Sequence, residues 1–64
     1  MSNPPSRDKL TMGMMVQIVQ KQDQDTGNLT NGKVKRILTS SHVHPHGIKV
    51  RLEDGQVGRV KVIL

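Results

Sequence analysis

The sequence predicts an all-β protein, a small SH3-like barrel of four to five antiparallel strands with a disordered N-terminal tail. Short runs alternate aliphatic and polar residues, which is typical of strands with one buried face, while no helical periodicity persists beyond two turns. Clusters of Gly, Pro, Asn and Asp separate these runs. With 64 residues and no Phe, Tyr, Trp or Cys, the core must be thin and aliphatic, so closure of the sheet is the simplest way to stabilise it.

The N-terminal region differs in composition from the rest of the chain. Residues 1–11 combine Pro, Ser, Asn and charged residues with little to bury, and they are predicted to form a disordered tail. Residues 12–64 are expected to form the barrel domain. Its first strand is expected over 14–20, with Met14, Val16 and Ile18 on one face and Met15, Gln17 and Val19 on the other.

A polar loop follows, and the second strand is expected over 33–38. Val34 should face inward, together with either Ile37 or Leu38. Two adjacent apolar residues after an alternating run indicate a bulge or a strand end near Arg36, a device that bends small sheets toward closure.

Asp54-Gly55, between two strand-like runs, predicts a β-hairpin, because Gly adopts φ > 0 without a Cβ clash. A two-residue loop would place Val50 opposite Arg59 and mix aliphatic with charged side chains on one face. A three-residue loop with Gly55 as the left-handed residue instead places Val50 opposite Gly58. We expect the longer loop, since it separates the two faces. The inward set is then Ile48, Val50, Leu52, Val60 and Val62, and the outward set is Lys49, Arg51, Val57, Arg59 and Lys61.

Charge points to a polyanionic partner. Ten Lys and Arg against five Asp and Glu give a net charge of +5. Like charges on paired strands repel, and this repulsion must be offset either by water and salt or by a bound polyanion. Two interpretations of the charged face follow. It is either a solvated surface whose charges discourage pairing between sheet edges, or a site that binds the phosphate backbone of RNA or DNA. The candidate nucleic-acid-binding residues are Lys33, Lys35, Lys49, Arg51, Arg59 and Lys61.

The missing aromatic residues shape this expectation. Proteins that bind single strands commonly stack bases on aromatic rings, and this chain has none. We therefore expect an electrostatic RNA-binding module with weak sequence selectivity, directed at structured RNA or the ribosome. The alternative is a protein–protein interaction adaptor that uses an exposed strand edge or the loop over 21–31.

Three histidines form the third candidate. His42, His44 and His46 would project to one side of an extended chain, and neutral imidazoles can bind zinc. Ligands two residues apart on a strand lie about 6–7 Å apart, however, so three rarely converge on one ion. Metal binding is thus the less favoured function, and no metal or other cofactor is expected. No enzyme is expected either, because the sequence has no Cys nucleophile, phosphate loop or convincing carboxylate pair.

The distribution of apolar residues bears on the location of the protein. No apolar run approaches the roughly 20 residues that span a bilayer, and the N-terminus has no hydrophobic segment resembling a signal peptide. We expect a cytoplasmic protein without membrane contact, either a monomer or a weak homodimer.

Several local sequences carry a family resemblance. They are Gly13 with the strand after it, KQDQ at 21–24, TG at 26–27, GKV at 32–34, ILTSS at 37–41 and HPHGIKVRLEDGQVGRV at 44–60. On these residues the chain resembles the YwbE-type family of short, uncharacterised microbial proteins. The resemblance covers nearly everything after residue 12 and implies a compact stand-alone domain, but it assigns no catalytic or binding residue.

Overall fold

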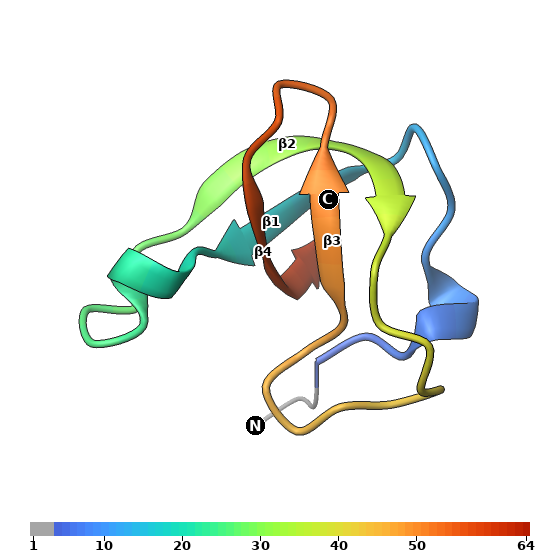
Figure 1. Ribbon diagram of the computed structural model, residues 1–64, viewed down its shortest axis with the longest axis horizontal. Coiled ribbons are helices and arrows are strands. Elements are labelled where there is room, and N and C mark those ends of the chain that lie inside the picture. Colours follow the sequence, from blue (N-terminus) through green and yellow to red (C-terminus); the bar gives the residue numbers. More distant parts are fainter. Residues whose placement is uncertain (1–3) are drawn as a thin grey trace.

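The computed structural model describes residues 4–64, in which four antiparallel strands close into a barrel (Figure 1). Each strand pairs with its neighbours in the chain, and the last strand also pairs with the first. The all-β class and the small barrel are therefore confirmed. The strands are β1 (Met15–Val19), β2 (Thr30–Ile37), β3 (Lys49–Leu52) and β4 (Val57–Ile63), and the two 3₁₀ turns are η1 (Arg7–Lys9) and η2 (Lys21–Asp23).

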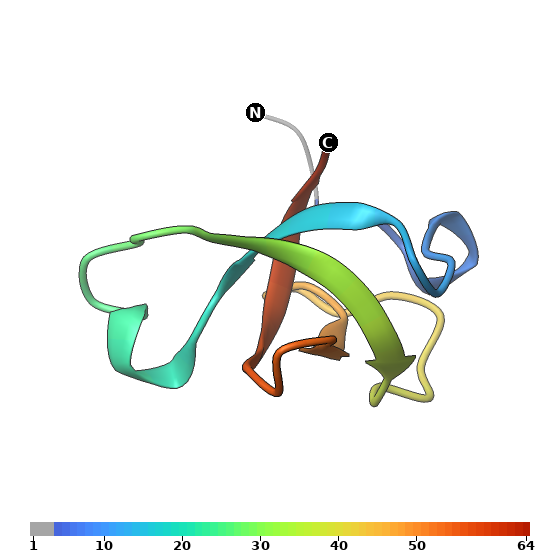
Figure 2. The same ribbon diagram turned by 90° about the horizontal axis from the view of Figure 1, so that it is seen from above.

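The two 3₁₀ turns lie at opposite ends of the molecule, as Figures 1 and 2 both show. Between them β2, the longest strand, bends across the barrel and pairs with β1 through its first half and β3 through its second. None of the helical segments in the described residues has the length and hydropathy to span a bilayer.

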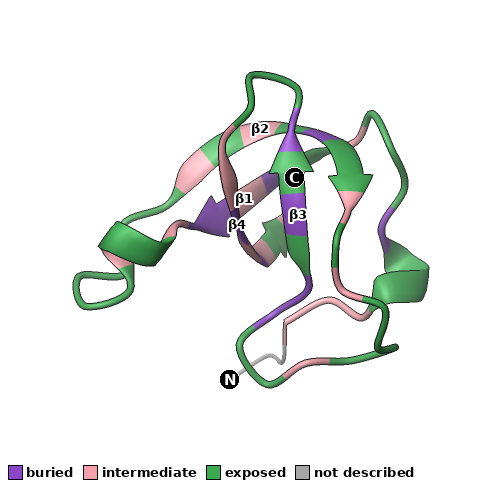
Figure 3. Ribbon diagram, in the orientation of Figure 1, coloured by how far each residue is buried: buried purple, intermediate pink, exposed green. Residues whose placement is uncertain are grey.

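The core is wholly aliphatic and lies between the strands (Figure 3). Buried and more exposed positions alternate along β3 and through the first half of β4, as the sequence predicted. β1 buries Val16, Ile18 and Val19, whereas Val34 is the buried residue of β2. Met14, Ile37 and Ile63 pack against this cluster from its margin. The buried cluster consists of Leu10, Val16, Ile18, Val34, Ile48, Val50, Leu52 and Val60.

The hairpin joining β3 and β4 has the predicted register. Val50 pairs with Gly58, and the Leu52 amide donates to the carbonyl of Gln56 at 2.8 Å. Gly55 has φ +93° and donates its N–H to the carbonyl of Leu52 at 3.0 Å. The three-residue loop is confirmed, because this pairing directs the aliphatic side chains of β3 inward and its cations outward.

β2 carries the predicted bulge. Val34 pairs with Leu52, but Arg36 pairs with Arg51, so Lys35 is the extra residue. The strand begins at Thr30, earlier than the sequence indicated, because its first residues pair with β1. Ile37 is the residue that packs on the core, whereas Leu38 is 40% exposed, which decides the alternative that the sequence left open.

Val62 was predicted to face the core, and this is wrong. A second bulge interrupts the pairing of β1 with β4, so that Lys61 has no partner on β1 and the alternation along β4 shifts by one residue. Val62 is consequently 40% exposed, and Ile63 takes the inward position. The pairs on either side of this bulge are Ile18 with Val60 and Gln17 with Val62.

The N-terminal segment also differs from the sequence prediction of a disordered tail over 1–11. Residues 1–3 lie outside the described residues. Residues 4–11 lie against the barrel, and Leu10, at only 6% exposure, belongs to the core cluster. The backbone N–H of Arg7 donates to the carbonyl of His42 at 2.7 Å. A single well-placed apolar side chain thus anchors a segment whose average composition is polar.

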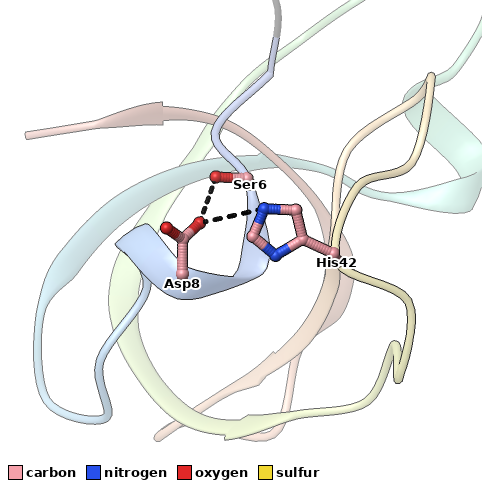
Figure 4. A network of polar contacts seen from close by, with 3 residues as sticks. All are labelled: Ser6, Asp8 and His42. Atoms are coloured by element: carbon pink, nitrogen blue, oxygen red, sulfur yellow. Dashed lines mark hydrogen bonds and ion pairs between the residues drawn. The ribbon is translucent and has the colours of Figure 1, made fainter.

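Side chains add to this anchoring (Figure 4). The Asp8 carboxylate accepts a hydrogen bond from the Ser6 hydroxyl and lies 3.6 Å from Nε2 of His42. The Ser6 hydrogen bond, and then the nearby His42, lower the pKa of Asp8. Arg7 reaches further and donates from Nε to the Thr39 carbonyl at 3.0 Å. The N-terminal segment is therefore tied to the loop that precedes β3.

Candidate nucleic-acid interface

Cations from three neighbouring strands form a band on the outside of the barrel. Arg36 of β2 lies opposite Arg51 of β3, and Lys49 of β3 lies opposite Arg59 of β4. Residues two apart on a strand share a face, so Lys49 and Arg51 connect the two pairs. We call this set the basic band, and its members are Lys35, Arg36, Lys49, Arg51, Arg59 and Lys61.

Five of the six predicted binding residues belong to the basic band. Lys33 extends it only along β2, where it is level with Met15 of β1, and its carbonyl accepts a hydrogen bond from the Glu53 backbone at 2.9 Å. Arg36 belongs to the band although the sequence analysis did not select it. The bulge at Lys35 brings Arg36 opposite Arg51, and the bulge predicted near Arg36 was the signal that could have identified it.

The band is not neutralised by carboxylates. The only ion pair within 4.0 Å among residues 4–64 joins Asp8 and His42, at the η1 end of the molecule. The remaining acidic residues lie in the η2 loop and in the β3–β4 turn. Because no carboxylate among the described residues lies within 4.0 Å of these cations, they create a positive potential, which attracts polyanions.

A groove lies beside the band, between the η2 loop and the outer face of β4. One part of it has a volume of about 270 Å³. A second space of about 460 Å³ adjoins it and shares Val19, Gln24 and Arg59. The first space is lined by Val19, Gln24, Gly27, His46, Arg59 and Lys61, and the second by Val19, Lys21, Gln22, Gln24, Lys49, Val57, Gly58 and Arg59.

Neutral oxygens orient the two cations at the floor of the groove. Arg59 donates from Nη1 to the Gly47 carbonyl at 3.2 Å and to the Thr39 hydroxyl at 3.3 Å. Lys61 donates from Nζ to the His46 carbonyl at 2.7 Å. These acceptors fix the side chains without cancelling their charge, and each cation keeps further N–H donors for a ligand.

An amide network holds the opposite wall of the groove, at the start of the η2 loop. Gln20 donates to the Thr30 hydroxyl at 3.1 Å and to the Gln56 side-chain oxygen at 2.8 Å. Gln56 in turn donates to Asp54 through its side chain at 2.6 Å and its backbone N–H at 3.1 Å. These two hydrogen bonds lower the pKa of Asp54, so its carboxylate is charged near neutral pH. The η2 loop and the β3–β4 turn are thereby joined.

The histidines do not converge on one point. His42 faces Asp8, whereas the rings of His44 and His46 have centroids 5.8 Å apart. Nδ1 of His44 accepts the backbone N–H of His46 at 3.1 Å, which occupies one potential ligand nitrogen. Within residues 4–64, no three His, Cys, Asp or Glu side chains are grouped closely enough to hold a metal ion.

The environment of His44 reports the local potential. Desolvation, followed by the charges of Arg59, His46 and Lys61, lowers the pKa of its imidazole. Partial burial and neighbouring positive charge both disfavour protonation. Arg59 and Lys61 thus place positive charge beside His44.

Comparison with known proteins places the chain in a family. A family described as an uncharacterised conserved protein, DUF2196, matches residues 3–63. The chain belongs to this family. The chain is also 56% identical over 62 residues to the "Uncharacterized protein YwbE" of Bacillus subtilis (strain 168). That alignment covers 97% of this chain and 95% of the Bacillus protein. These findings confirm the resemblance seen in the sequence.

No solved structure matches the chain. The DUF2196 match spans the strands, both loops that wall the groove and the whole basic band.

Proposed function

We propose that this protein binds nucleic acid, with structured RNA as its ligand, through phosphate contacts along the basic band. The observation that supports the proposal is the row of cations across β2, β3 and β4 without a carboxylate partner among the described residues. Each cation that neutralises a phosphate releases condensed counterions, which is a favourable term for association.

The kind of nucleic acid follows from what the band contains. It offers guanidinium and ammonium groups, and the chain has no aromatic ring on which a base could stack. Contacts to phosphates carry no sequence information, whereas base contacts do. Binding should accordingly be strongly salt-dependent and nearly independent of sequence. It should also favour helical RNA, whose phosphates are held in fixed positions.

The paired residues Arg36 and Arg51 allow a direct test. Both are exposed, and neither side chain donates a hydrogen bond within the described residues. We expect the double variant Arg36→Gln/Arg51→Gln to bind an RNA hairpin at least about tenfold more weakly at moderate salt. The log–log dependence of affinity on salt should also become shallower by about two, one for each lost phosphate contact. Fluorescence anisotropy over a salt series measures both quantities.

A charge-matched control separates the band from bulk charge. Lys9 is exposed on η1, at the far end of the molecule from η2. Lys9→Gln removes the same charge as the single variant Arg51→Gln and should change the affinity and the salt slope less than Arg51→Gln does. Equal losses in these two single variants would contradict a defined interface.

The protein adaptor is distinguished by crosslinking in cells, followed by identification of bound RNA and protein together. Recovery of RNA that depends on Arg36 and Arg51 supports the proposal. Recovery of one protein partner that stays bound at high salt, with no RNA, would favour the adaptor instead.

A further inference from the structure

We propose that the groove between the η2 loop and β4 binds the terminal phosphate group of an RNA strand, that is, a phosphomonoester. This inference rests on the proposed function, since the strand attached to that phosphate would continue along the basic band. The groove includes residues outside the basic band, among them Gln24, Gly27 and His46.

The lining of the groove suits an anion. The residues that line its first space include the cations Arg59 and Lys61 together with Gln24 and His46, whose side chains can donate hydrogen bonds. Among the described residues, no Asp or Glu lines either space. These groups come from three separate segments, the η2 loop, the loop before β3 and β4 itself, so they surround the space from several sides.

The two cations are preorganised for a ligand. The carbonyl of His46 holds Lys61, and the carbonyl of Gly47 holds Arg59, before any anion arrives. Ordering a long side chain on binding costs conformational entropy, and side chains fixed in advance avoid much of that cost. An anion in this groove would replace water at the N–H donors of Arg59 and Lys61, whose side chains are already held in place.

The charge of the ligand favours a terminal over an internal phosphate. A phosphomonoester carries about −1.5 to −2 at pH 7 and presents three strong acceptor oxygens. An internal phosphodiester carries a single charge and has two free oxygens. The positive charges of Arg59 and Lys61 therefore stabilise the monoester more than the diester.

The adjoining space provides a path for the rest of the strand. Val19 and Val57 supply apolar contacts, and Lys49 lies at its margin beside Arg59. Arg51 follows two residues along β3, on the same face as Lys49. A ribose can thus lie over the apolar part of the groove while the next phosphates reach the band.

End chemistry provides the test. We expect an RNA hairpin with a phosphate at one end to bind about tenfold more tightly than the same hairpin with hydroxyl groups at both ends, since charge-assisted hydrogen bonds differ by this order. Hairpins phosphorylated at the 5′ end and at the 3′ end are measured separately. A preference for either end supports the proposal, and equal affinity for all three hairpins would overturn it.

A matched pair of variants locates the effect. Gln24→Glu introduces a negative charge into the groove at an exposed loop position, and its side chain forms no hydrogen bond among the described residues. Gln17→Glu changes the charge equally on β1, outside the groove lining. We expect Gln24→Glu to abolish the preference for a phosphorylated end and Gln17→Glu to retain it. Equal loss in both variants would show a bulk charge effect and reject the site.

Inorganic phosphate separates this inference from the proposed function. In NMR titrations at constant ionic strength, phosphate should produce saturable shifts at Gln24, Gly27 and Arg59, and Gln24→Glu should remove them. Small shifts spread over the whole band would overturn the groove assignment. If RNA binds through Arg36 and Arg51 without any end preference, only the groove inference fails. If no RNA binds but the phosphate shifts are saturable and local, the groove stands as an anion site and the proposed function fails.

Discussion

Gly47 shows how much can depend on one residue. It is buried with φ +102°, and a Cβ at this position would collide with the backbone carbonyl of Val60. The same residue offers its own carbonyl to Arg59. Gly47 therefore lets the loop before β3 pass close to β4, and this close approach places His46 and Arg59 at the groove.

Gly55 provides the control for a substitution of Gly47. Both glycines have positive φ, but a Cβ at Gly55 would meet no atom within 4 Å. Gly55→Ala should destabilise the fold by about 1–2 kcal/mol through backbone strain alone. Gly47→Ala should exceed this by about 1–3 kcal/mol, because it adds an overpacked contact with backbone. Urea denaturation measures the difference, and equal losses would contradict the close approach.

At the scale of the element, β4 contributes residues both to the core and to the groove, because the alternation of its inward and outward side chains shifts by one residue at the bulge. Before the bulge, Val60 faces the core and Arg59 reaches the groove, which the bulged residue Lys61 also lines. After the bulge, Ile63 turns inward and Val62 outward. The bulge closes the barrel against β1 while the first half of the strand keeps its cations together.

Two alanine substitutions test this change of face. Val60 is fully buried, so Val60→Ala should lower the free energy of unfolding by about 1.5–3 kcal/mol. Val62→Ala removes the same atoms from an outward position and should cost less than about 0.5 kcal/mol. Urea midpoints at a common slope give both values. A loss at Val62 as large as that at Val60 would mean that the alternation continues unbroken through Lys61.

At the scale of the whole molecule, a four-stranded barrel of this length recruits its N-terminal segment to complete the core. Leu10 joins the buried cluster, and Arg7 and Asp8 hold the segment against the loop before β3. That loop also supplies the carbonyls that orient Arg59 and Lys61. Core completion and groove geometry therefore depend on the same loop.

The contribution of the N-terminal segment can be measured through Leu10. Leu10→Ala should destabilise the protein by about 2–3 kcal/mol, because it removes a buried side chain and leaves a cavity. Met12→Ala, at a position 61% exposed, should change stability by less than about 0.5 kcal/mol. Chemical denaturation of both variants tests this, and a neutral Leu10→Ala would mean that the segment does not pack in solution.

Local chemistry made much of the architecture predictable. Asp54-Gly55 and the alternation on either side set the hairpin register, since only one loop length separates aliphatic from charged side chains. The bulge near Arg36 was visible as two consecutive apolar residues. Four members of the basic band, Lys49, Arg51, Arg59 and Lys61, followed from that register, because side chains two apart on a strand share a face, and Lys35 was predicted from the neighbouring strand.

The tertiary structure decided what no local pattern records. The bulge at Lys61 arises from the pairing of β1 with β4, which joins the two ends of the sheet, so the outward position of Val62 could not be read from the alternation of β4. The packing of Leu10 and the groove between Gln24 and Arg59 likewise need segments that are distant in the chain. Sequence periodicity sets which face of a strand is apolar, whereas closure of the barrel sets which faces meet.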